Sequence, residues 1–222
     1  MASKRFPASI STKGRRKNPS SAGSTSVFRS RPRVAFKAGD GVADDALLTH
    51  IPTIDDVLEG HASSLGNDLV AYRHHVYRVV NSCIRMVGGR NALEKITTAA
   101  VFHDLGIWTD KTFDYIAPSI ALAREHLVAH EREDWITEIS TMIADHHKIT
   151  PSIANPTSLV EPLRQADWID VTCGLRRFGV PRRFVARLFA AWPDAGSHWR
   201  LLQLALHRFR THPLTPLPMV RL

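Results

Sequence analysis

Apolar residues recur along most of the chain at the three- and four-residue spacing of amphipathic α-helices. The clearest apolar stripe lies in residues 67–87, which Gly88-Gly89 follow as a typical C-terminal stop. This stripe consists of Leu69, Tyr72, Val76, Val79, Val80, Cys83 and Val87. No segment alternates with a period of two between hairpin turns, and no internal repeat is present. The pattern therefore predicts an all-α fold, a single bundle of about seven helices.

Residues with capping preferences indicate where the other helices begin and end. We expect Thr53 to cap a short helix that runs to Leu58. Asn91 is expected to cap a helix that passes through Leu105, with Gly106 as its C-terminal stop. Proline is tolerated in a first helical turn, so Pro118 is expected to start the next helix. The ranges predicted for the later helices are 118–130, 133–147, 158–173, 181–192 and 196–210.

The first 43 residues differ from the rest in composition and charge. Ten of the chain's 29 Lys and Arg residues lie in residues 1–39, which contain no Asp or Glu, so the rest of the chain holds 19 basic and 21 acidic residues. Such a polar segment cannot bury enough apolar surface to offset its ordering entropy. We therefore predict a disordered basic tail (1–43), followed by one helical domain (44–222). A solvated tail, an organellar transit peptide and a nucleic-acid contact stay open as its roles.

Several features bear on the compartment in which the chain works. Apolar runs are too short to cross a membrane, and the N-terminus lacks the apolar stretch of a secretory signal. Only two cysteines are present, Cys83 and Cys173, and both are expected to be free thiols. Asn18 and Asn155 each precede proline, so neither is a glycosylation acceptor. These features predict a cytoplasmic protein, or one of a mitochondrion or other organelle if the tail is a transit peptide.

Histidine and aspartate, the usual protein ligands of divalent transition metals, are placed as a buried site requires. His103-Asp104 directly follow the apolar run 99–102 at a predicted helix end, where polar side chains are costly unless paired or bound to metal. His75 lies beside the apolar stripe of 67–87. Asp167 and Asp170 are one turn apart and share a helical face. The placement, more than the residue types, indicates a metal site.

Three local sequences are similar to the motifs of the HD superfamily of metal-dependent phosphohydrolases. His75-Val76-Tyr77-Arg78-Val79 resembles its first motif, His-x-x-Arg-Val. Residues 100–106 (Ala-Val-Phe-His-Asp-Leu-Gly) resemble its His-Asp signature, and residues 166–170 (Ala-Asp-Trp-Ile-Asp) its final Ala-Asp-x-x-Asp. The resemblance covers about residues 65–175. It implies an HD-type helical domain with metal ligands His75, His103, Asp104 and Asp167, and His74 as an outward neighbour.

Additional histidines between the second and third motifs resemble those of the six-ligand, two-metal branch of the superfamily. That branch includes phosphodiesterases and di-iron oxygenases. His126 and the pair His146-His147 have the corresponding spacing, although His126 also fits an ordinary surface position. Residues 148–151 (Lys-Ile-Thr-Pro) replace the glycine-rich sequence that follows the His-His of cyclic-dinucleotide phosphodiesterases. Whether His146 or His147 is the ligand stays open.

The resemblance implies hydrolysis of a phosphate mono- or diester of a small molecule, with nucleotides as the first candidates. One or two divalent cations (Mn, Fe, Co, Ni, Zn or Mg) would activate the attacking water, with Asp104 in the catalytic set. Arg78 and Lys148 are expected to bind phosphate, and Arg164 is a further candidate. A di-iron oxygenase and a non-catalytic HD-fold protein are the alternatives. The expected partner is the phosphate ester, not nucleic acid or a membrane; the oligomeric state is not predicted.

Overall fold

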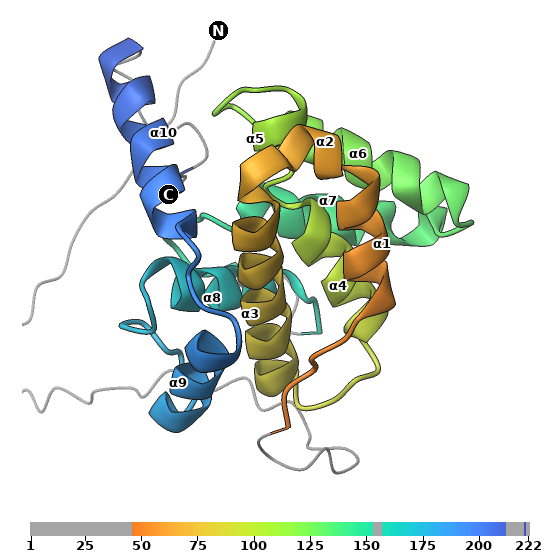
Figure 1. The fold of residues 1–222 in the computed structure, drawn as a ribbon. Coiled ribbons are helices and arrows are strands. Elements are labelled where there is room, and N and C mark those ends of the chain that lie inside the picture. The colour runs from red at the N-terminus through yellow and green to blue at the C-terminus, as the bar shows by residue number, and fades with distance from the viewer. Residues whose placement is uncertain (1–45, 153–156, 212–219, 221–222) are drawn as a thin grey trace, which may run out of the picture. The chain divides into compact units, whose positions relative to one another are not determined.

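Helix α3 (Leu69–Val87) is buried over most of its length because its valines and Cys83 face neighbouring helices on several sides. It packs between α4 (Leu93–Phe102) and α8 (Val160–Val171), near the middle of the view in Figure 1. The computed structural model describes residues 46–152, 157–211 and 220. The helix ends at Gly88, whose φ of 77° is a left-handed conformation that glycine adopts without strain.

The described residues contain helices and no strand, so the all-α prediction is confirmed. Eight α-helices have nine residues or more, close to the number predicted. In addition to α3, α4 and α8 they are α1 (Pro52–Gly60), α6 (Ile116–Ala129), α7 (Ile136–Asp145), α9 (Arg182–Ala191) and α10 (Ser197–Thr211). The short elements are α2 (Ala62–Leu65), α5 (Gly106–Thr109) and the 3-10 turns η1 (Gly66–Asp68) and η2 (Glu133–Trp135).

Two groups of helices lie on either side of α3. In Figure 1, α1, α4 and α6 lie to one side of α3, and α9 and α10 to the other. Fully buried apolar side chains fill the space between α4 and α7, among them Ile96, Ile139 and Ile143. A smaller apolar cluster joins α10 to α5 and the start of α6. The functional side chains described below come from α3, α8 and the C-terminal ends of α4 and α7.

The two predicted N-caps are wrong. Helix α1 begins at Pro52, one residue before Thr53, because proline has its φ preset for a first helical position and lacks the N–H that a cap would satisfy. Helix α4 begins at Leu93, so Asn91 lies outside it. There the N–H of Leu93 donates to the carbonyl of Arg90, and this turn sets the start of the helix.

Gly106 has a role other than the predicted helix stop. Helix α4 already ends at Phe102, and Gly106 is the first residue of α5. A Cβ at this position would lie 2.6 Å from the carbonyl oxygen of Tyr115 and 2.9 Å from Pro118 Cβ. Glycine is therefore needed for close packing against the start of α6. That helix begins at Ile116, so Pro118 lies within its first turn.

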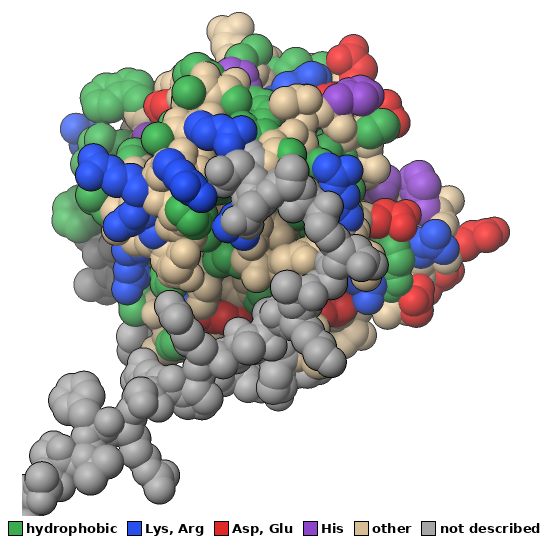
Figure 2. Space-filling model, turned by 90° about the horizontal axis from the view of Figure 1, so that it is seen from below, with side chains coloured by type: hydrophobic (Ala, Val, Ile, Leu, Met, Phe, Trp, Pro, Cys, Tyr) green, Lys and Arg blue, Asp and Glu red, His purple; other side chains and the backbone are tan. Residues whose placement is uncertain are grey.

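The charge of the described part is unevenly distributed. On the face shown in Figure 2, Lys and Arg side chains lie close together among hydrophobic ones, and acidic side chains lie mainly toward one edge. The predicted tail, residues 1–43, lies outside the described residues, all of which fall within one compact unit, Val34–Leu222.

The two cysteines are free thiols, as the sequence predicts: Cys83 is buried and Cys173 is exposed. They lie in α3 and just after α8. Among the described helices, none has both the length and the apolar character needed to cross a membrane.

Candidate metal centre

Six ionisable side chains converge at the place where α3, α8 and the ends of α4 and α7 meet. Five of them are buried, and the side chain of His147 is 16% exposed. The six are His75, His103, Asp104, His146, His147 and Asp167. They form three overlapping groups of three, in each of which one ligand atom per residue lies within 4.8 Å of the others. These buried His and Asp groups could hold a metal ion.

The helix ends fix the orientation of two of these imidazole rings. His103 and His146 occupy the C-cap positions of α4 and α7. Each ring donates its Nδ1–H to the carbonyl three residues earlier, of Ala100 and Ile143 respectively, at 2.6 Å. The proton on Nδ1 leaves a lone pair on Nε2, the form in which a neutral histidine binds metal. The same local geometry therefore presents two ligand nitrogens to one space.

His75 presents its Nε2 in the same way from the middle of α3. Its Nδ1 donates to Asp170 Oδ2 at 2.6 Å, and its Nε2 lies 2.9 Å from Nε2 of His103. Two ligand atoms bound at right angles to one cation, about 2.1 Å from each, are separated by about 3.0 Å. The spacing of the two rings is therefore compatible with a shared cation.

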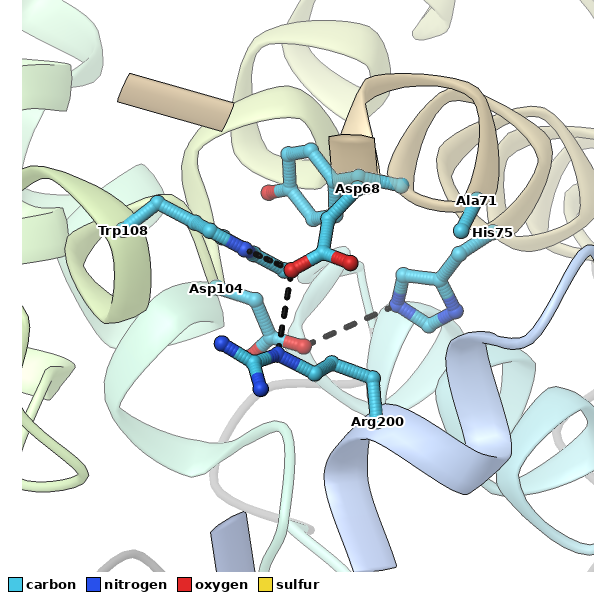
Figure 3. Close-up of a pocket in the computed structure, with 7 residues that line it drawn as sticks. Asp68, Ala71, His75, Asp104, Trp108 and Arg200 are labelled. Carbon is cyan, nitrogen blue, oxygen red and sulfur yellow. Dashed lines mark hydrogen bonds and ion pairs between the residues drawn. The ribbon is translucent and has the colours of Figure 1, made fainter. Parts of the chain in front are cut away.

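The carboxylate of Asp104 has its two oxygens toward different histidines. Oδ2 lies 3.4 Å from His103 Nε2 and 3.7 Å from His75 Nε2. Oδ1 lies 3.3 Å from His146 Nε2. In Figure 3 this carboxylate and the ring of His75 point toward one another from separate elements. Asp104 thus lies between two sets of nitrogen ligands.

Asp167 on α8 is arranged in the same manner. Its Oδ1 lies 3.7 Å from Nε2 of both His75 and His103. Its Oδ2 lies 3.3 Å from Nδ1 of His147. Both carboxylates therefore have one oxygen toward the pair His75–His103 and the other toward His146–His147.

Three of these carboxylate oxygens have histidine neighbours but no hydrogen-bond partner. Within the described part of the chain, Asp104 Oδ1 and both oxygens of Asp167 are buried and accept no hydrogen bond. Burial raises the pKa of each carboxyl, but the neighbouring histidines outweigh it and lower the pKa. A buried carboxylate is costly unless it is paired or bound to metal. A cation in this space would satisfy all three oxygens.

The histidines are affected by the same charges. Burial lowers the pKa of His103, but Asp104 and Asp167 outweigh it and raise the pKa to about 9. The pKa of His147 is lowered to about 4 by its burial and by His146, so its ring is neutral near pH 7 and free to act as a ligand. Opposite pKa shifts of adjacent groups indicate a site that attracts positive charge and still offers lone pairs.

Arg78 is buried and hydrogen-bonded to protein partners. Its side chain is 1% exposed; Nε and Nη2 donate to the carboxylate of Asp170, and Nη1 donates to the carbonyl of Trp192 at 2.9 Å. All three nitrogens of the guanidinium therefore donate hydrogen bonds to acceptors within the protein. In these contacts Arg78 holds Asp170, which in turn orients His75. Phosphate binding by Arg78 stays a prediction.

Three other predicted residues also lie outside the centre. His126 on α6 packs against Phe102 and His130, at ring distances of 5.1 and 4.1 Å, and belongs to none of the three groups of potential ligands among the described residues. Lys148 directs Nζ toward Asp145, 3.9 Å away. Arg164 is buried against Glu161. His74 points outward, as expected, and its Nδ1 donates to the carbonyl of Pro193.

A small cavity opens beside the centre. Its volume is about 20 Å³, enough for roughly one water molecule. Its lining consists of Asp68, Ala71, Tyr72, His75, Asp104, Trp108 and Arg200 (Figure 3). Two of the metal-ligand candidates, His75 and Asp104, thus belong to the lining of this cavity.

Several of these functional residues were not predicted from the sequence. Asp170 had a usable signal, because it lies one turn after Asp167 in the third motif. Asp68 and Arg200 had none, since they are 132 residues apart and belong to no motif. The hydroxyl of Tyr115, 3.4 Å from His146 Nε2, was missed for the same reason.

Comparison of the chain with protein-family models, curated proteins and solved structures finds no match.

Proposed function

We propose that the protein is a metal-dependent phosphohydrolase of the HD type. It cleaves a phosphate mono- or diester of a small molecule, with nucleotides as the first candidates, and water is the nucleophile. The proposal rests on the arrangement of Asp104 and Asp167: each carboxylate has one oxygen toward the pair His75–His103 and the other toward His146–His147. A carboxylate that bridges two cations presents its oxygens in this way, and three of these oxygens have no other partner within the described residues. The proposal is therefore for two cations per chain.

The residues of the chain have distinct tasks in this scheme. His75 and His103 would hold one cation and His146 and His147 the other, with both aspartates shared. When bound, divalent cations polarise a phosphoryl oxygen and lower the pKa of water toward neutrality. Mixed nitrogen and carboxylate ligands suit Mn, Fe, Co, Ni or Zn, and Mg is also compatible. Asp170 keeps the ring of His75 in the tautomer that binds metal.

The HD resemblance is supported by where its motif residues lie. Its four expected ligands, His75, His103, Asp104 and Asp167, come from three separate helices or helix ends and meet at one point. The pair His146–His147 completes a set of six, as in the two-metal branch. Motifs that matched by chance would have no reason to converge in space.

A di-iron oxygenase is the second candidate. The same four histidines and two aspartates suit a pair of irons. The cavity of about 20 Å³ favours this alternative, because it admits a molecule of the size of water or dioxygen more readily than a nucleotide. A phosphate ester is larger than this cavity, so it would require part of the lining to shift.

One experiment separates these functions. The purified full chain is analysed for bound metals, then supplied with a panel of phosphate mono- and diesters, including nucleotides, while phosphate release and oxygen uptake are measured. Two metals per chain with phosphate release is the expected result. Two irons with oxygen uptake and no phosphate release would establish the oxygenase. Absence of both metal and turnover would leave the non-catalytic alternative.

A further inference from the structure

We infer that Arg200 of α10 forms the subsite that binds the phosphate group of the substrate, at the opening of the metal centre. This inference rests on the proposed function and deepens it. Arg200 lines the cavity together with His75 and Asp104, although it lies more than ninety residues from either in the sequence. In Figure 3 its guanidinium extends from α10 toward Asp68.

Arg200 is the basic side chain of a cavity whose lining otherwise carries acidic charge. Of the described residues that line it, Asp68 and Asp104 are acidic and Arg200 alone is a Lys or Arg. The cations of the proposed centre would offset the charge of Asp104, whereas Asp68 is not a metal ligand and would repel the negative charge of a phosphate ester unless a positive side chain lies beside it. Arginine is suited to this, because its planar guanidinium donates two parallel hydrogen bonds to phosphate.

The guanidinium is held at one edge and available at the other. Its Nε donates to Asp68 Oδ2 at 3.0 Å, and the same oxygen accepts a hydrogen bond of 2.9 Å from Trp108 Nε1. Within the described part of the chain, Nη1 and Nη2 have no hydrogen-bond partner. The side chain is 43% exposed, so these two groups can meet an incoming anion without a large desolvation cost. Asp68 orients the guanidinium of Arg200 before phosphate arrives, which reduces the entropy lost when phosphate binds.

Helix α10 is attached so that Arg200 faces the opening. Leu204, one turn after Arg200 on the same face, packs against the apolar cluster of Ile107, Tyr115 and Ile116. The residues that were expected to bind phosphate are engaged elsewhere: Arg78 and Arg164 are buried against carboxylates, and Lys148 is directed toward Asp145. Arg200 is therefore the basic residue with both the position and free donors.

The test compares two substitutions on the same helix. Arg200→Gln removes the charge at the opening, and Arg210→Gln removes an exposed charge near the far end of α10. For each protein we would measure metal content, the dissociation constant of inorganic phosphate by calorimetry, and KM and kcat for p-nitrophenyl phosphate. Loss of a charged hydrogen-bond pair corresponds to an affinity change of about ten- to a hundredfold.

Arg200→Gln should keep its metal and its helix content but raise both the phosphate dissociation constant and KM by about ten- to a hundredfold. Arg200→Lys should recover part of this loss, and Arg210→Gln should match the wild type. Asp68→Ala leaves the guanidinium in place and should weaken phosphate binding less than Arg200→Gln does. An equal loss in Asp68→Ala would mean that Arg200 acts only by holding Asp68.

The possible failures can be told apart. If the wild type holds metal and hydrolyses esters, but Arg200→Gln binds phosphate as Arg210→Gln does, the subsite is wrong and the proposed function stands. If the wild type neither binds inorganic phosphate nor releases it from any ester, the proposed function is wrong and the subsite with it.

Discussion

Asp170 accepts a hydrogen bond of 2.6 Å from His75 Nδ1, across 95 residues of sequence. Burial raises the pKa of Asp170, but the hydrogen bond from His75 and the guanidinium of Arg78 outweigh it and lower the pKa to about 2. The group is therefore an anion at any pH near neutrality. It keeps the proton of His75 on Nδ1 and so leaves Nε2 free as a metal ligand.

Replacement of Asp170 by Asn should weaken metal binding by about ten- to a hundredfold, the usual effect of losing a hydrogen-bond partner of a ligating histidine. It should also lower stability, by about 3–5 kcal/mol, because Arg78 loses its buried counter-ion. Both effects can be measured, by chelator competition and by urea unfolding. Asp114→Asn, at an exposed position, is the control. If both variants bound metal equally well, Asp170 would have no role in orienting His75.

The positions of two histidines predict different metal stoichiometries. His126→Ala should leave the metal content unchanged, since that ring packs on Phe102 outside the centre. His147→Ala should reduce it from about two ions per chain to about one, since it removes the nitrogen nearest Asp167 Oδ2. Elemental analysis of the two proteins, prepared in parallel, provides the comparison. A loss of metal in His126→Ala alone would reverse these assignments.

Gly106→Ala should destabilise the protein by about 1–3 kcal/mol, the range for an overpacked site. The added methyl would lie 2.9 Å from the backbone nitrogen of Ser119, and neither backbone can move away easily. Gly60→Ala is the matched control, because a Cβ at Gly60 has no atom within 4 Å. Thermal unfolding measures both changes. Equal midpoints would show that α5 and α6 are not as closely packed as the structure indicates.

Glu161 gives a pH-dependent contribution to stability. Burial raises its pKa, but hydrogen bonds from Arg164, the backbone of Ser152 and Gln165 outweigh it, so the pKa of the folded state is lowered. A carboxyl with a lowered pKa stabilises the fold at pH values above the unfolded-state pKa, about 4.3, and this stabilisation is lost as the pH falls through the folded-state value.

Glu161→Ala should therefore cost about 3 kcal/mol at neutral pH, because Arg164 is left buried without its partner. The difference from the wild type should shrink as the pH falls below about 4. Urea unfolding over this pH range, with the exposed Glu125→Ala as control, measures the trend. A difference that stays constant with pH would exclude the charged pair as its cause.

The parts of this centre that could be predicted are those with a local signal. His103-Asp104 follow an apolar run at a helix end, and this pattern alone indicates two polar groups aimed at the core. The three motifs carry their ligands at fixed spacing on separate helices. The existence of the helices was predicted by periodicity, whereas the starts at Pro52 and Leu93 were missed because the capping preferences of Thr53 and Asn91 were not used there.

The remaining features depend on which way a side chain turns once the helices pack. Arg78 has the spacing of a site residue, but its guanidinium runs to Asp170, 92 residues later. His126 has the spacing of a ligand, yet the packing of α6 turns it toward Phe102. Asp68 and Arg200 meet only because α10 returns to α5. No local pattern contains that information.

The metal content of Asp104→Ala, measured beside its turnover, tests the central claim most directly. Asp104 faces both histidine pairs, so its removal should reduce bound metal from about two ions per chain to fewer than one and abolish phosphate release. The helix content in the presence of a chelator should still match the wild type, because the core contacts of Val101, Phe102 and Leu105 are untouched. Full metal content and full activity in Asp104→Ala would contradict the carboxylate-bridged centre, and with it the proposed function.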